Sequence, residues 1–218
     1  MKKIITNNSL SLAFLLLFVL AIIGQTFFGL AQYNEQRIED HVNPVSLLQY
    51  FSTGHFLEAT FENWESEFLQ MALFVIFTIF LQQKGSSESK DFHKKEDVDR
   101  EPSVLRRHVP WPVKKGGWIL IFYKHSLTLV LLMLFALSFV VHFYGSLKEE
   151  NEKLALHHKP LETVSSFIGS SKIWFESFQN WQSEFLSVFA IIVLSIFLRQ
   201  QGSSQSKPVD APDNQTGE

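Results

Sequence analysis

The sequence predicts an all-α membrane protein with four transmembrane helices in two tandem two-helix repeats of the same orientation, together with outer interfacial helices. Three observations support this prediction. Two long runs are almost free of charge, two shorter apolar runs each follow the same polar motif, and the second half of the chain repeats the first at a spacing of 117 residues. The 218-residue length alone would also allow one or two soluble domains.

The two long runs predict the first and third membrane spans. Ser9–Leu30 has 22 positions without a charge, and Ser126–Tyr144 has 19 positions whose ionisable groups are a histidine and a terminal tyrosine. At about 1.5 Å per residue, each run is long enough to cross a hydrocarbon core about 30 Å thick. We place these spans at residues 9–30 and 122–144. The first run also resembles a cleavable signal peptide, but the matching run in the middle of the chain favours its retention.

The two short runs predict the second and fourth spans. Phe68–Leu81 and Phe185–Leu198 have 14 residues each, which cover only about 21 Å as a helix. Each helix must therefore recruit the polar residues that precede it. We place these spans at residues 64–83 and 181–200.

An internal duplication organises the chain. Residues 63–90 align without a gap to residues 180–207, with 15 identities in 28 positions. The same spacing aligns residues 8–36 to 125–153, with 10 identities in 29 positions. A fixed period of this kind marks repeated structural units. The predicted organisation is repeat 1 at residues 1–90, a charged cytoplasmic linker at 91–117, repeat 2 at 118–207 and a cytoplasmic tail at 208–218.

The distribution of Lys and Arg predicts the orientation. The N-terminal segment, the linker with the approach to the third span, and the C-terminal tail hold 14 of the 19 basic residues. Because basic residues accumulate in cytoplasmic loops, both chain ends should face the cytoplasm. The loops at 31–63 and 145–180 then face outward. Pro44 can open a short helix lying on the outer membrane surface, although a surface loop with scattered aromatics remains an alternative.

The motif NWxSEF precedes both short runs, as "NWESEFL" and "NWQSEFL". An asparagine at a helix start can satisfy a free backbone amide, and a tryptophan is favoured at a membrane interface. The motif thus predicts helix caps at Asn63 and Asn180 and interfacial anchors at Trp64 and Trp181. A glycine after the last helical turn can adopt the left-handed conformation, which predicts C-terminal caps at Gly85 and Gly202.

A polar layer is predicted near the outer ends of the spans. Glu67 and Glu184 begin a helical stripe of polar side chains that should face the interior of a helix bundle. At a similar depth, the first helix of each repeat carries Gln25 and His142, which correspond at the 117-residue spacing. Such a layer can fasten helices by hydrogen bonds, or it can hold a proton or a cation. The residues leave both interpretations open.

Composition excludes several functions. The net charge of −3 gives no electrostatic support for nucleic-acid binding, and the absence of cysteine removes disulfides and thiol chemistry. The chain has no Gly-rich phosphate loop, no HExxH zinc pair and no GxSxG nucleophile. We therefore expect no cofactor, no bound metal and no catalytic residue.

The NWxSEF motif, its following apolar run and the GSSxSK segment after each run resemble an uncharacterised family of small bacterial membrane proteins, described only as a domain of unknown function. This resemblance covers both halves and implies a bacterial inner-membrane location, but no activity. A non-enzymatic scaffold or interaction protein is the leading hypothesis. A small oligomeric proton or cation channel or transporter is the alternative, and an enzyme ranks third. The expected partners are the lipid bilayer and either further copies of the chain or another membrane protein.

Overall fold

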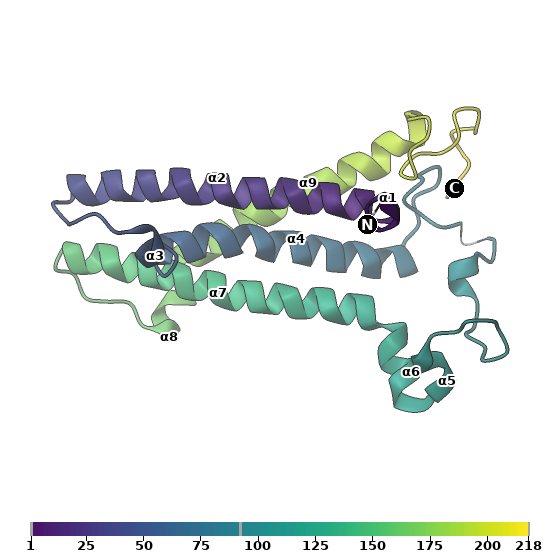
Figure 1. The fold of residues 1–218 in the computed structure, drawn as a ribbon, viewed down its shortest axis with the longest axis horizontal. Helices are drawn as coiled ribbons and strands as arrows, with labels where there is room; N and C mark the ends of the chain where they lie inside the picture. Colours follow the sequence, from purple (N-terminus) through teal and green to yellow (C-terminus); the bar gives the residue numbers. More distant parts are fainter. Residues whose placement is uncertain (1, 92, 218) are drawn as a thin grey trace. The chain divides into compact units, whose positions relative to one another are not determined.

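The computed structural model describes residues 2–91 and 93–217, and this part of the chain is mainly helical and contains no strand (Figure 1). Four long helices dominate it. The elements in chain order are α1 (Lys2–Asn7), α2 (Ser9–Glu39), α3 (Leu47–Tyr50), α4 (Gly54–Phe80), the 3-10 helix η1 (Asp97–Asp99), α5 (Trp111–Lys115), α6 (Gly117–Lys124), α7 (Ser126–Leu156), α8 (Val164–Phe167) and α9 (Ser171–Phe197). The predicted linker therefore contains η1 and α5.

Contacts divide the chain into two compact units. The first comprises Met1–Phe61 and Val141–Ser170, and the second comprises Glu62–Val140 and Ser171–Glu218. Helices α4 and α7 therefore each contribute one end to each unit.

Three helices, α2, α7 and α9, are long and apolar enough to cross a membrane. Within the described residues, α4 is long enough but not apolar enough to be counted with these three helices. Its first half carries four carboxylates, so that only the part from Phe68 onward is continuously apolar. The composition of α4 therefore supports three spans rather than the four expected.

The long helices continue beyond the predicted spans, and this corrects the predicted N-terminal caps. Helices α4 and α9 start at Gly54 and Ser171, so Asn63 and Asn180 lie inside the helices and cap neither of them. The hydroxyl of Thr53 instead accepts a hydrogen bond from the Phe56 amide at 3.2 Å, and it caps α4. The prediction was wrong because it assumed that each helix begins where the motif begins.

The predicted C-terminal caps also need correction. Gly85 and Gly202 do have positive φ angles of 90° and 84°. However, α4 and α9 already end at Phe80 and Phe197. Both glycines thus lie in turns that follow the helices, where the left-handed conformation costs them little.

The expected outer interfacial helices are single turns. Ser46 and Thr163 open α3 and α8 with capping boxes. In each box, the side chain of the capping residue accepts a hydrogen bond from the backbone amide three residues later, and the side chain of that later residue accepts one from the backbone amide of the capping residue. Each turn ends in a buried aromatic side chain, because Tyr50 and Phe167 are both only 1% exposed. The other three residues of each turn are exposed, so these single turns lie at the surface of the first unit and are anchored to it by one aromatic side chain each.

In the first unit, two glycines let α4 and α7 cross closely. A Cβ atom on Gly54 would lie 2.7 Å from both the carbonyl oxygen of Gly145 and the Cα of Glu149. A Cβ atom on Gly145 would lie 2.5 Å from the backbone nitrogen of Glu58. Since real Cβ atoms do not approach backbone this closely, only glycine fits at this crossing.

Local structure recurs at the spacing found in the sequence. Helices α2 and α7 both have 31 residues, and α4 and α9 both have 27. In the α2–α3 connection, the side chain of Asn34 donates to the Val45 carbonyl at 3.0 Å and accepts from the Val45 amide at 2.7 Å. Asn151 makes the same two bonds to Glu162, at the same distances.

Candidate functional site

The predicted polar layer is divided between the two units. Gln25 and His142 belong to the first unit, whereas Glu67 and Glu184 belong to the second. In the first unit, the Gln25 side chain donates to the Thr60 hydroxyl at 2.9 Å, which joins α2 to α4. His142 is fully buried on α7. Thus Gln25 does act as an inter-helix hydrogen-bond donor.

In the second unit, the buried position is taken by a carboxylate outside the predicted polar layer. Glu65 is fully buried, and its Oε1 accepts a hydrogen bond from the Trp181 indole nitrogen at 2.8 Å. Glu67 is exposed instead, although it interacts electrostatically with Glu184 on α9. Trp64, the other predicted anchor, is partly buried. The first copy of the motif contains two glutamates, and counting a helical face from Asn63 selected the exposed Glu67 rather than the buried Glu65.

Asn180 strengthens the same connection between α4 and α9. Its side-chain amide donates to the Glu62 carboxylate and also to the Glu176 carbonyl, one turn earlier in α9. The NWxSEF motif of the second repeat therefore bonds across to the acidic first half of α4. Its asparagine and tryptophan both join helices.

The first unit contains a cluster of aromatic and ionisable side chains, which we call the tyrosine–histidine cluster: Tyr33, Tyr50, His55, Glu149 and Glu152. The Tyr33 hydroxyl donates to Glu152 at 3.0 Å. The Tyr50 oxygen lies 2.9 Å from Nδ1 of His55. The ring centroids of Tyr33 and His55 are 5.2 Å apart. Residues from α2, α3, α4 and α7 therefore meet in one partly buried network.

Burial sets the protonation states in this cluster. Removal from water, with a smaller contribution from Glu149, raises the pKa of Tyr50 to about 12. Tyr50 thus keeps its proton and can donate it to the neutral Nδ1 of His55, which places the histidine proton on Nε2. Removal from water also lowers the pKa of His55, against an opposing effect of Glu149. The pair is stable as neutral tyrosine and neutral histidine.

This lowered pKa predicts that acid destabilises the protein. Because the unfolded chain takes up the His55 proton at a higher pH than the folded chain does, stability is retained above about pH 6.5 and falls below it. We expect Tm to decline between about pH 7 and pH 5. Thermal unfolding followed by circular dichroism tests this, with His55→Gln as the variant that should flatten the decline. An equal slope in both proteins would contradict it.

A cavity of about 420 Å³ adjoins the cluster and is lined in part by Tyr33, Arg37, Glu149, Glu152 and Lys153. Glu149 is only 4% exposed, and its Oε1 lies 3.3 Å from the Lys153 ammonium. Its other oxygen, Oε2, has no hydrogen-bond partner within the described residues. A buried carboxylate oxygen in that condition is costly, and it marks a place for a donor.

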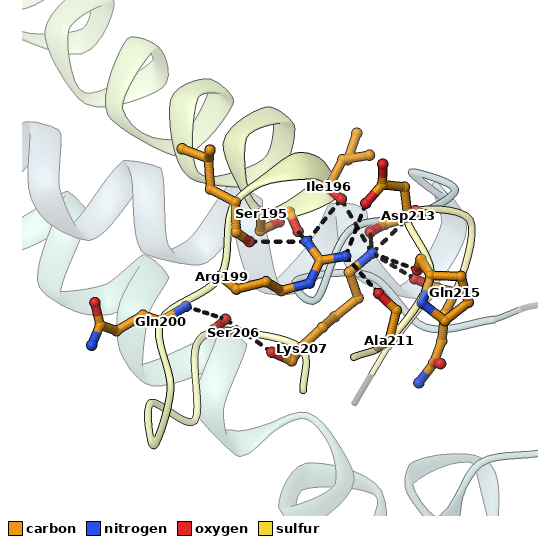
Figure 2. Close-up of polar contacts among 12 residues, drawn as sticks. Ser195, Ile196, Arg199, Gln200, Ser206, Lys207, Ala211, Asp213 and Gln215 are labelled. Atoms are coloured by element: carbon orange, nitrogen blue, oxygen red, sulfur yellow. Dashed lines mark hydrogen bonds and ion pairs between the residues drawn. The ribbon is translucent and has the colours of Figure 1, made fainter. Parts of the chain in front are cut away.

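The second unit contains a different polar structure, the tail clamp, which is formed by Lys207 and Arg199 (Figure 2). Lys207 is only 1% exposed. Its ammonium group has three N–H donors, which are shared among five backbone carbonyl oxygens within hydrogen-bond distance, those of Gly85, Ile196, Pro212, Asp213 and Gln215; the distances to Asp213 and Gln215 are 3.1 Å. The lysine thus ties the end of α9 to the turn after α4 and to the C-terminal segment.

Arg199 reinforces the clamp beside Lys207. Its guanidinium donates to the carbonyls of Ile196 and Ala211 and to the Asp213 carboxylate, each at 3.0 Å (Figure 2). Cations that donate to the last carbonyls of a helix are favoured by its dipole. Burial and the nearby Arg199 lower the pKa of Lys207, while Asp213 raises it.

Further hydrogen bonds close the clamp around the turn that follows α4. The amide of Gly85 donates to the Thr216 hydroxyl, and the amide of Gly217 donates to the Ser86 carbonyl, both at 3.0 Å. The hydroxyls of Ser86 and Ser195 lie 2.9 Å apart. The residues after α4 and the C-terminal segment are therefore held together as one folded structure.

A family model described as "Domain of unknown function (DUF6766)" matches residues 1–218. The chain belongs to this family. The expected membership in an uncharacterised family is thereby confirmed, and the DUF6766 description assigns no activity or site residue. No curated protein and no solved structure matches this DUF6766 chain. In its described part, no group of three or more His, Asp or Glu side chains is placed to hold a metal ion.

Proposed function

We propose that this protein is a non-enzymatic scaffold or interaction protein of the bacterial inner membrane. The observation that carries the proposal is the exposure of its apolar helices. Only 6% of the apolar stretch of α2 and of α9, and 17% of that of α7, is buried within the chain. Surfaces of this kind require lipid or partner helices to cover them.

The polar contacts support the same function. The bonds from Gln25 to Thr60 and from Trp181 to Glu65 each join two helices of this chain. Hydrogen bonds of this type contribute about 0.5–2 kcal/mol each to helix association in membranes. Such contacts suit a rigid framework whose outer faces are free for partners, either other copies of the chain or another membrane protein.

The proposal includes four spans from a tandem duplication. The matched helix lengths and the repeated asparagine bonds support the duplication. For α4, its 27 residues give a length of about 40 Å, and two of its four carboxylates, Glu62 and Glu65, accept hydrogen bonds from α9. Both chain ends then face the cytoplasm, as the positions of Lys and Arg predict.

In-cell crosslinking tests the scaffold function. A photoreactive residue at exposed apolar positions of α9, such as Leu186 or Phe189, should give discrete adducts with partner proteins or with a second copy. The same residue at the buried Ile173 serves as the control and should give none. Lipid adducts alone at every exposed position would contradict the scaffold function.

An orientation test is independent of partners. A periplasm-active reporter and a cytoplasm-active reporter fused after the last residue should report a cytoplasmic C-terminus. The same pair inserted between His158 and Lys159 should report an outward loop. Equal scores for both sites would contradict the proposed arrangement of spans.

The electrostatic interaction between Glu67 and Glu184 favours a second candidate, a small oligomeric proton or cation channel. Carboxylates within membrane-spanning helices often mark ion pathways. Under this hypothesis the double variant E67Q/E184Q should abolish proton flux in liposomes while leaving assembly intact. The control E35Q/E39Q changes two exposed carboxylates at the end of α2. Absence of flux from the unmodified protein at all pH values would rule the channel out.

A further inference from the structure

The cavity beside the tyrosine–histidine cluster carries charges of both signs. Arg37 and Lys153 contribute cationic groups, whereas Asp40, Glu149 and Glu152 contribute carboxylates. Arg37 uses its Nε to donate to the Asn43 carbonyl at 2.8 Å, and its guanidinium lies 5.6 Å from the Tyr33 ring centroid. These two contacts hold the arginine at the cavity wall. A guanidinium fixed in this way is suited to a phosphate, which it binds through two parallel hydrogen bonds.

The acidic side of the cavity is suited to a hydrogen-bond donor with a positive charge. Glu149 is almost fully buried, and its Oε2 has no partner in the described structure. Glu152 is already engaged by Tyr33. A primary ammonium group supplies both the charge and the N–H donors that Glu149 lacks. A quaternary ammonium supplies the charge but no donor.

The cavity lies at a defined depth relative to the apolar runs. Tyr33 and Arg37 follow the end of the first run at Leu30 by about 5 Å and 10 Å along α2. In a bilayer, the headgroup region extends several ångströms beyond the hydrocarbon core on each side. If α2 spans the membrane as proposed above, the cavity therefore opens at headgroup level.

We propose that this cavity binds a primary ammonium group joined to a phosphate, the chemistry of phosphoethanolamine. Glu149 receives the ammonium group, and Arg37 with Lys153 receives the phosphate. The volume of about 420 Å³ is ample for such a group. The three residues that bind the ligand, Arg37, Glu149 and Lys153, all belong to the first unit. The assignment of a lipid headgroup as its source rests on the proposed membrane function.

Titration of the purified protein in detergent with phosphoethanolamine and phosphocholine tests this recognition. Isothermal calorimetry should detect phosphoethanolamine and give at least about tenfold weaker binding for phosphocholine, which lacks N–H donors. Glu149→Gln should remove this preference, and Arg37→Gln should weaken both ligands. Glu39→Gln is the matched control, because Glu39 is exposed at the end of the same helix and does not line the cavity.

A second arm distinguishes the two sources. Native mass spectrometry of protein released from nanodiscs of mixed phosphatidylethanolamine and phosphatidylcholine should show retained phosphatidylethanolamine if the headgroup is the ligand. Binding of free phosphoethanolamine without lipid retention would assign a soluble ligand. Neither retention nor binding, or equal affinity of unmodified protein and Glu149→Gln for phosphoethanolamine, would overturn the proposal. If Glu149→Gln does not fold, the phosphocholine comparison and Arg37→Gln decide the question. These measurements are independent of the crosslinking and reporter-fusion tests, so that failure of the ligand site can be distinguished from failure of the proposed membrane function.

Discussion

Replacing Gly145 with alanine is expected to destabilise the protein by about 1–3 kcal/mol, because the added methyl group has no space where α4 and α7 cross. The atoms it would meet are the Glu58 nitrogen and backbone or Cβ atoms of Leu57. These atoms belong to a helix that cannot give way without displacing the cluster beside it. The measurement is Tm in detergent, followed by circular dichroism, for the unmodified protein and for Gly145→Ala.

The chain supplies a matched control for this substitution in Gly24. A Cβ atom on Gly24, also inside a long helix, would meet nothing within 4 Å. Gly24→Ala should therefore be neutral or stabilise the helix by up to about 1 kcal/mol, since alanine is the better helix former. Equal losses of Tm in the two variants would show that the crossing has no special dependence on glycine.

Replacing Lys207 with methionine is expected to release the C-terminal segment. The substitution removes the ammonium group from five carbonyl oxygens and keeps a side chain of similar length. Hydrogen bonds to charged groups contribute about 1.5–3 kcal/mol each, although their contributions do not add fully. A local loss of about 2 kcal/mol speeds amide exchange by roughly 30-fold. Hydrogen exchange at residues 211–217 measures this release.

Lys90 is the natural control because it aligns with Lys207 at the 117-residue spacing of the sequence. Its ammonium group lies 2.6 Å from the Asp99 carboxylate, in a partly exposed ion pair. Surface pairs of this kind contribute little to stability, so Lys90→Met should leave exchange at residues 211–217 nearly unchanged. A larger effect from Lys90→Met than from Lys207→Met would contradict the assignment of the clamp.

The sequence predicted those features that depend on local apolar composition. The long runs at 9–30 and 126–144 form parts of α2 and α7. An uninterrupted apolar segment of that length is typical of a membrane-spanning helix. Helix ends were predicted less well. The polar residues before Phe68 and Phe185 carry no signal that distinguishes a cap from the interior of a longer helix. Their role depends on bonds to the neighbouring helix.

The tyrosine–histidine cluster could not be predicted from the sequence. Tyr33, Tyr50, His55 and Glu149 come from four elements, and no spacing between them is typical of a site. The burial of Glu65 was missed for a related reason. Glu65 and Glu67 lie in the same helical turn, and the hydrogen bond from Trp181 to Glu65 depends on the neighbouring helix. Lys207 likewise resembles an ordinary tail lysine until its five carbonyl partners are brought together by the fold.

The glycine crossing also bears on how the protein is made. Gly54 emerges from the ribosome long before Gly145, which is 91 residues later in the chain. At about 5–20 residues per second, α4 waits roughly 5–20 s for the helix it must cross. During that interval Tyr33, Tyr50 and His55 have been synthesised, but the carboxylates of α7 have not. Under the proposed arrangement of spans, the first helix pair therefore reaches the bilayer before the helix that completes its glycine crossing has been made.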